Sequence, residues 1–221
     1  MLKLYHTPIS ANSRRVWIAL LEKGIEFEQV VIQLNGDQFK PEFLEMNPFH
    51  HIPVLEDDGF QVIESLAILD YLEAKYPTPS LLPTDAKAIA TVRMVELVTI
   101  TELLPPTIRL TSQAMNLAEN EPQKLESAHQ QVLTVLNFLE KLLGESPYFA
   151  SDKLTLADIA AGTVVPQLPK IGVSLDDYPK LKAWCDRLMQ RESWQKTEPT
   201  PEEIEAFFSR MKTLVAAYQN R

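Results

Sequence analysis

The chain has 221 residues, enough for one large or two modest domains. Its formal net charge of -9 argues against nucleic acid as the main partner, because phosphate binding needs clustered Lys and Arg. The single cysteine excludes an internal disulfide, and no apolar stretch is long enough to cross a membrane. We therefore expect a cytoplasmic enzyme or binding protein with no signal peptide.

The first part of the chain alternates strand patterns with helix patterns. Residues 2–5 and 27–32 read as strands, and an apolar-periodic helix lies between them. Asn12 or Ser13 is expected to cap this helix. A strand, a helix and a strand at this length predict a βαβ unit with a parallel pair of strands.

A short helix at 41–46 leads into a second group of strands. Residues 54–56 and 60–63 flank an Asp-Asp-Gly turn signal, which predicts a β-hairpin. Ser65 is expected to cap the apolar-periodic helix that follows. The order of the predicted elements is therefore βαβ-α-ββα.

The loop before the hairpin and the start of the helix after it have features that could bind a ligand. A helix start offers free backbone N–H groups and partial positive charge, so it suits a carboxylate. Glu64, just before that helix, could pair with an ammonium group, so that Glu64 and Ser65 together could hold both ends of an α-amino acid. A cis bond between Ile52 and Pro53 would turn a backbone edge outward to pair with an extended peptide.

A proline-rich segment at 77–85 predicts a domain boundary, and everything after it reads as helical. Thr155 and Asp158 have capping-box spacing, and Thr200 to Glu203 form a second box. The last helix is expected to pack back on the body, over the substrate site. The expected helices are 86–108, bent or broken at Pro105-Pro106, then 122–143, 154–165, 178–190 and the one after Thr200.

The stretch from Asn47 to Leu69 resembles the glutathione-binding half of the cytosolic glutathione S-transferase family, and the similarity extends over essentially the whole chain. The resemblance implies an α/β thioredoxin-like N-terminal domain at 1–77 and an all-α C-terminal helical domain at 86–221. It also implies that the backbone at Ile52-Pro53 pairs with the cysteinyl unit of glutathione. The Glu64-Ser65 position would hold the γ-glutamyl unit.

The chemistry implied by this family needs the glutathione sulfur as a thiolate, which a donated hydrogen bond near a helix N-terminus stabilises. Ser10 is our first candidate donor, because Thr7-Pro8-Ile9-Ser10 followed by Arg14-Arg15 resembles the motif of the serine-type phi and theta classes. A plain helix-capping role is the alternative for Ser10. Tyr5 is the rival donor, and Asn12 and Ser13 are further possibilities. The cysteine-type branches are disfavoured, since the loop holds no Cys.

Other site residues follow from the resemblance. His51 takes the place of a phi-class Gln that reaches the glutathione backbone, and Gln38 and Lys40 fall near the glycyl carboxylate. His50 and Gln38 depart from the phi pattern, so the class stays open, a bacterial class included. We predict no metal, because the adjacent pair His50-His51 rarely makes a site alone.

The electrophile pocket is expected near Pro106 and Arg109, with polar surface as the alternative for Arg109. Arg14 and Arg15 either add positive potential near the thiolate or form a solvated helix face. Cys185 is expected to be a buried, inert thiol.

The resemblance implies a glutathione transferase that acts on small apolar electrophiles in detoxification, as a homodimer, with glutathione as co-substrate. The isomerase branch is a second enzyme hypothesis, weakened because its Ser-Ser-Cys loop is absent here. A non-catalytic binding or regulatory protein on the same fold is the alternative from another class. The intact Ile52-Pro53 and Glu64-Ser65 pairs speak against it.

Overall fold

The computed structural model describes residues 1–117 and 121–219. The chain divides into two compact units. The first unit is Met1–Ser80 together with Glu192–Phe207, and the second is Leu81–Arg191 together with Phe208–Arg221.

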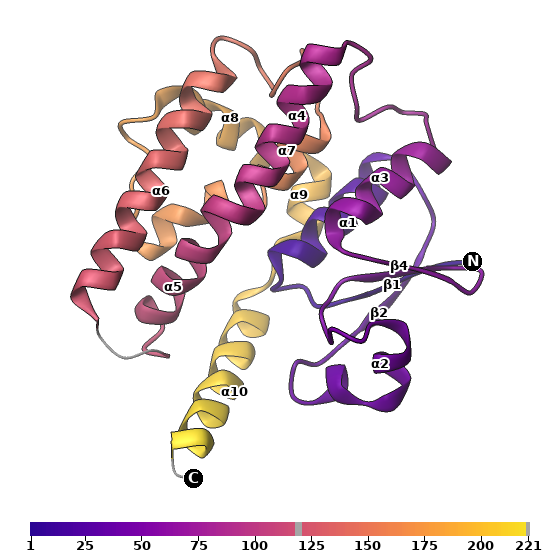
Figure 1. The fold of residues 1–221 in the computed structure, drawn as a ribbon, viewed down its shortest axis with the longest axis vertical. Coiled ribbons are helices and arrows are strands. Elements are labelled where there is room, and N and C mark those ends of the chain that lie inside the picture. Colours follow the sequence, from indigo (N-terminus) through magenta and orange to yellow (C-terminus); the bar gives the residue numbers. More distant parts are fainter. Residues whose placement is uncertain (118–120, 220–221) are drawn as a thin grey trace. The chain divides into compact units, whose positions relative to one another are not determined.

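A four-stranded sheet of order β2-β1-β3-β4 organises the first unit in the described part of the chain (Figure 1). β1 pairs with β2 in parallel, whereas β1 with β3 and β3 with β4 are antiparallel. The predicted βαβ unit and β-hairpin are thus confirmed. The strands are β1 (Leu2–His6), β2 (Glu28–Val31), β3 (Val54–Asp57) and β4 (Phe60–Ile63).

Helices lie on both faces of this sheet, with α1 and α3 packed against each other on one face and α2 on the other (Figure 1). A small apolar core of Ile32, Phe43 and Val54 lies under α2. The helices of the unit are α1 (Ala11–Glu22), a 3₁₀ turn η1 (Asp37–Phe39), α2 (Pro41–Met46), α3 (Ser65–Lys75) and α9 (Glu192–Thr197).

Two predicted helix caps are wrong by one to three residues. Ser10, rather than Asn12 or Ser13, caps α1: its backbone is extended and its Oγ accepts from the Ser13 backbone N–H at 3.3 Å. Glu64 holds the N-cap position of α3, and Ser65 is its first helical residue. In both cases the capping residue lies closer to the N-terminus than the sequence predicts.

The arginines at the start of α1 are buried, which excludes a solvated helix face. Arg14 is 3% exposed and pairs with Glu198 at 2.5 Å. Its guanidinium also donates to Trp194 O at 3.1 Å and Thr197 Oγ1 at 3.2 Å. Arg14 therefore attaches α9 to α1 within the first unit, although 180 residues separate them in sequence.

The second unit is helical in its described residues. α4 packs on α7, α5 on α6 and α6 on α8. Its elements are α4 (Ala86–Val98), a π-helical turn η2 (Thr99–Leu103), α5 (Leu104–Ala114), α6 (Pro122–Leu143), α7 (Leu156–Ala161), a 3₁₀ segment η3 (Val165–Ile171) and α8 (Pro179–Met189).

The helix expected at 86–108 differs from the structure in two respects. Its interruption, η2, lies just before the two prolines rather than at them, and the helical segment continues as α5 to Ala114. Pro105 and Pro106 stand in the first turn of α5, directly after η2, and having no N–H they donate no backbone hydrogen bond to the preceding turn. A π-helical turn holds more residues than an α-helical turn, and η2 is the place where this helix does so.

The capping box at the start of α7 is confirmed, and it is buried. The Asp158 carboxylate accepts from the Thr155 N–H and Thr155 hydroxyl, both at 2.8 Å. It also accepts from the Phe149 N–H at 2.9 Å and from Trp184 Nε1 at 2.8 Å. One carboxylate thereby ties α7 to α8 and to the segment before α7.

The last helix, α10 (Pro201–Gln219), begins with the predicted second capping box. The Glu203 carboxylate accepts from the Thr200 N–H at 2.8 Å, and Thr200 Oγ1 accepts from the Glu203 N–H at 3.2 Å. The packing of this helix over the substrate site stays a prediction, because the side chains beyond Thr213 lie outside the described residues. Among the described helices, none combines the length and apolar character that crossing a membrane requires.

Candidate functional site

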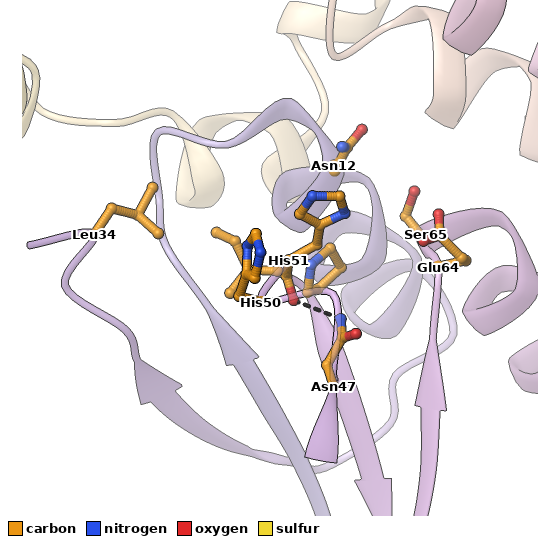
Figure 2. A pocket seen from close by; sticks show the side chains of 9 residues that line it. Asn12, Leu34, Asn47, His50, His51, Glu64 and Ser65 are labelled. Carbon is orange, nitrogen blue, oxygen red and sulfur yellow. Dashed lines mark hydrogen bonds between the residues drawn. The ribbon is translucent and has the colours of Figure 1, made fainter. Parts of the chain in front are cut away.

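A cavity of about 300 Å³ lies in the first unit, where the loop before β3 meets the starts of α1 and α3 (Figure 2). Polar and apolar groups share its wall. The lining residues are Asn12, Leu34, Asn47, His50, His51, Ile52, Pro53, Glu64 and Ser65. Five of them are predicted site residues, from two separate parts of the sequence: His51, Ile52, Pro53, Glu64 and Ser65.

Asn47 holds the loop that forms one side of the cavity. It is 1% exposed; its Nδ2 donates to the His51 carbonyl at 2.8 Å, and its Oδ1 accepts from the Phe49 N–H at 3.0 Å (Figure 2). Sequence reasoning missed this role, although an Asn before a proline is a typical loop signal. The Ile52-Pro53 peptide bond is cis, as the resemblance implies.

The two histidines stand on this loop with their rings in contact. The His50 ring lies 5.0 Å from that of Phe39 and 5.5 Å from that of His51, centroid to centroid. His50 has a φ of 50°, a left-handed backbone that non-glycine residues adopt rarely. Both imidazoles line the cavity, where their N–H groups can bind a polar ligand.

The start of α3 forms the other side of the cavity. Glu64 is exposed and has a φ of 66°, an uncommon backbone conformation for a side-chain-bearing residue. Ser65 is 5% exposed, and its Oγ accepts from the fully buried Arg15 guanidinium at 3.2 Å. A helix N-terminus, a hydroxyl and a guanidinium behind it make this side favourable for a carboxylate.

Three predicted residues of the first unit do not line the cavity. Ser10 caps α1 and is half-buried. Gln38 Oε1 accepts from the Gly36 N–H at 3.2 Å, and Lys40 pairs with Asp37 at 2.7 Å. The carboxylate of Asp37 raises the pKa of Lys40, so the lysine stays charged on a largely exposed loop.

The hydroxyl of Tyr5 already makes a hydrogen bond within the protein. Its hydroxyl donates to Glu56 Oε2 at 3.1 Å, and it packs at the edge of the small core under α2. Burial, and then Glu56, raise the pKa of Tyr5. A tyrosine held in this way is poorly suited to stabilise a thiolate, which disfavours the rival donor.

The predicted residues of the second unit lie on α5. Pro106 is buried and Arg109 is exposed. Cys185 is buried on α8, and burial raises the pKa of its thiol to about 12, as expected of an inert cysteine. Within the described ranges, no group of three or more His, Cys, Asp or Glu side chains is arranged to hold a metal ion.

Both halves of the chain match known domains. Residues 4–80 match the glutathione S-transferase N-terminal domain, and residues 99–192 match the glutathione S-transferase C-terminal domain. The expected fold class, a thioredoxin-like α/β domain followed by an all-α domain, is therefore confirmed.

Sequence relatives and solved structures agree with these matches. Maleylacetoacetate isomerase from Mus musculus is 33% identical over 212 residues, covering 91% of this chain and 96% of that protein. Glutathione S-transferase F10 from Arabidopsis thaliana is 31% identical over 207 residues, covering 89% and 96%. The structure of glutathione transferase E6 from Drosophila melanogaster superposes with a TM-score of 0.81 at 27% identity, covering 96% and 97%.

The two domain matches, the sequence relatives and the fold thus define the class as that of glutathione-dependent proteins. The chain belongs to the glutathione S-transferase family. It is a glutathione transferase enzyme, and its relatives use glutathione as co-substrate.

Proposed function

We propose that the chain binds glutathione in the cavity of the first unit and activates its thiol as a thiolate for attack on small apolar electrophiles. The observation that carries this proposal is the meeting of the backbone edge at Ile52-Pro53 with the start of α3 in one cavity. The first suits an extended peptide and the second suits a carboxylate.

The ends of glutathione have matching partners on the wall. Ser65, with Arg15 behind it, would bind the γ-glutamyl carboxylate, and the Glu64 carboxylate would pair with the ammonium group. The cysteinyl unit would pair with the backbone at Ile52-Pro53, with His51 contributing an N–H. Gln38 and Lys40 stay predicted contacts for the glycyl carboxylate, from outside the wall of the cavity.

Ser10 remains our proposed donor to the sulfur. Its Oγ already accepts the Ser13 N–H, which leaves the hydroxyl proton available to donate. It also stands at the positive end of α1, a helix of 12 residues. A thiolate near that end gains from the partial charge and the donated bond together.

The test is a titration of bound glutathione by thiolate absorbance, in the wild type and in Ser10→Ala. A free thiol has a pKa of about 8.5, and we expect a clearly lower value in the wild type and a return toward the free value in Ser10→Ala. A lowered pKa in both proteins would keep the transferase function and reject Ser10 as donor. Absence of glutathione binding would contradict the whole proposal.

A second candidate reaction is the isomerisation of maleylacetoacetate. It is favoured by the 33% identity to the isomerase from Mus musculus, and the absence of a Ser-Ser-Cys loop weakens it. Turnover of maleylacetoacetate compared with that of an activated aryl halide, both with glutathione, separates the two. Faster isomerisation at equal enzyme concentration would make it the principal activity.

The remaining parts of the proposal come from the family resemblance. They are a homodimer, a cytoplasmic location, a role in detoxification, an electrophile pocket at Pro106 and Arg109, and domain boundaries at 1–77 and 86–221. Sedimentation equilibrium tests the dimer. Kinetics of Arg109→Ala with two electrophiles of different polarity test the pocket.

A further inference from the structure

The loop between β2 and α2 carries an asparagine beside the cavity. Asn35 is exposed, and it directly follows Leu34, a residue of the cavity wall (Figure 2). The residue after it is Gly36, and no other asparagine of the sequence is followed by glycine. The proposed binding of glutathione assigns no contact to Asn35, which therefore stands next to the site without being part of its wall.

An Asn-Gly pair is chemically reactive, because the backbone nitrogen of the second residue can attack the side-chain amide of the first. A side chain on the second residue hinders this approach, whereas Gly36 has none and the space where its Cβ would lie is open. Gly36 also has a φ of 128°, which residues with a side chain rarely adopt. The exposure of Asn35 lets water reach the reacting groups.

A neighbouring side chain holds the attacking nitrogen. The Gly36 N–H donates to Gln38 Oε1 at 3.2 Å. The attack requires this nitrogen to lose its proton, and a hydrogen bond that favours the protonated form opposes that loss. The Gly36 carbonyl also accepts from the Phe39 N–H at 2.9 Å, which fixes the peptide units at the start of η1. The loop thus contains both a reactive pair and a contact that slows its reaction.

We propose that Asn35 is a modification site that deamidates spontaneously through Gly36, and that Gln38 restrains the reaction. The Gly36 nitrogen bonds to Cγ of Asn35, and the bond from Cγ to Nδ2 breaks, so that ammonia leaves and a cyclic imide remains. Water then opens the imide at either carbonyl and yields aspartate or isoaspartate. The net change converts one amide and one water molecule into a carboxylate and an ammonium ion, with no oxidation or reduction.

The product would place a new negative charge beside the cavity. Asp37, two residues on, already pairs with Lys40 at 2.7 Å, so the loop would carry a second carboxylate. Glutathione has a net negative charge, and a carboxylate next to Leu34 should weaken its binding. Isoaspartate also adds an atom to the main chain, which should displace Leu34. This consequence rests on the proposed function, whereas the reaction does not.

The first experiment ages four full-length proteins at mildly alkaline pH and physiological temperature: wild type, Asn35→Gln, Gln38→Ala and the control Gln123→Ala. Gln123 is an exposed glutamine on α6. Peptide mass spectrometry follows the conversion of amide to acid and separates isoaspartate from aspartate. Asn137, exposed on the same helix and followed by a phenylalanine, is the internal reference in every sample.

We expect Asn35 of the wild type to convert while Asn137 stays an amide. Asn35→Gln should convert far more slowly, because its longer side chain would have to close a larger ring. Gln38→Ala should accelerate conversion at Asn35 by about fivefold, the effect of losing one neutral hydrogen bond, and Gln123→Ala should match the wild type.

The second experiment measures glutathione affinity by calorimetry in fresh wild type, aged wild type and Asn35→Asp, at low and high salt. Asn35→Asp should weaken binding by about two- to threefold at low salt and by less at high salt, because the new charge lies on an exposed loop. Aged wild type should lose more than Asn35→Asp in proportion to its isoaspartate content.

Each part of the inference has a result that overturns it. Conversion at Asn35 no faster than at Asn137 would reject the modification site. An equal rate in Gln38→Ala and the wild type would reject the restraint by Gln38. Unchanged affinity in both Asn35→Asp and aged wild type would show that the modification does not affect the cavity. Fresh wild type that binds no glutathione would overturn the proposed function and leave the deamidation result standing.

Discussion

The starts of α3 and α7 differ in whether side chains of the protein accept from their exposed backbone N–H groups. Every helix start exposes backbone N–H groups that need acceptors. At α7, the side chains of Thr155 and Asp158 supply those acceptors as a capping box, in a fully buried network. At α3, the capping residue Glu64 makes no side-chain capping bond to the described residues, and its backbone is left-handed.

This difference distinguishes a helix start that stabilises the fold from one that can bind a ligand. A satisfied helix start holds the fold together and has nothing left to offer a ligand. An unsatisfied start beside a cavity is less favourable for the fold, but it is ready for a carboxylate. The predictions below test this contrast, beginning with the largest expected effect.

Replacing Asp158 with Ala should be the most destabilising of these changes. It leaves three buried donors without an acceptor: the N–H groups of Phe149 and Thr155, and Trp184 Nε1. The Thr155 hydroxyl also loses its bond to Asp158 but keeps the Phe149 carbonyl as acceptor. We expect a loss of about 4 kcal/mol in the free energy of unfolding, measured in denaturant. The exposed Asp152 in the same segment gives the matched control, and a similar loss in Asp152→Ala would contradict the special role of the box.

The same carboxyl should give stability a specific pH dependence. Burial raises the pKa of Asp158 to about 6, above its ordinary 3.8 and against the hydrogen bonds that favour the charged form. Between these values the native state holds the proton more tightly than the unfolded state, so rising pH lowers the contribution of Asp158 to stability. The total change is about 3 kcal/mol.

This contribution is isolated by subtracting the unfolding free energies of Asp158→Asn from those of the wild type at each pH, because other carboxyl groups titrate in both proteins. The difference should fall as pH rises from about 4 to about 6 and be flat above. A flat difference throughout, or one that rises with pH, would show that the native carboxyl has no raised pKa.

At α3, by contrast, a substitution should change binding more than folding. Ser65→Ala removes the hydroxyl that lines the cavity and that accepts from Arg15. We expect glutathione affinity to fall by about tenfold or more, because a hydrogen bond to a charged group is lost. Calorimetry measures the affinity, with the exposed Ser127→Ala on α6 as control. Unchanged affinity in a folded Ser65→Ala protein would place the carboxylate elsewhere.

The smallest effect is expected at Lys40. Its ammonium pairs with Asp37 on the surface, 65% exposed, and it does not line the cavity. Lys40→Ala should weaken glutathione binding less than about threefold, and that loss should shrink further in high salt. A loss as large as that of Ser65→Ala would mean that the ligand extends to Lys40, and that the cavity is only part of the site.

Local signals in the sequence predicted local structure well. The hairpin at 54–63 depends on a turn between two short apolar runs, and both capping boxes depend on residues three positions apart. Helix α6 was predicted to the residue, since proline begins it and Gly144 follows it. In each of these cases the partners that matter are neighbours in sequence.

The features that were missed involve partners far apart. Helix α9 is six residues long and carries little periodicity of its own. The burial of Arg14 depends on Trp194, Thr197 and Glu198, and that of Arg15 in part on Ser65. A pair of adjacent arginines in a sequence most often indicates a solvated face, and nothing local distinguishes this pair.

The sequence by itself determined the order of the elements, the family resemblance and five residues of the cavity wall. Tertiary structure alone decided that Ser10 caps α1 and that Gln38 and Lys40 stay outside the wall. It also decided which four further residues complete the wall: Asn12, Leu34, Asn47 and His50. The physical reason is the separation in sequence between the residues that interact. Capping, turns and periodicity are set by residues within one or two turns of each other, whereas a cavity is set by which distant segments the packing brings together.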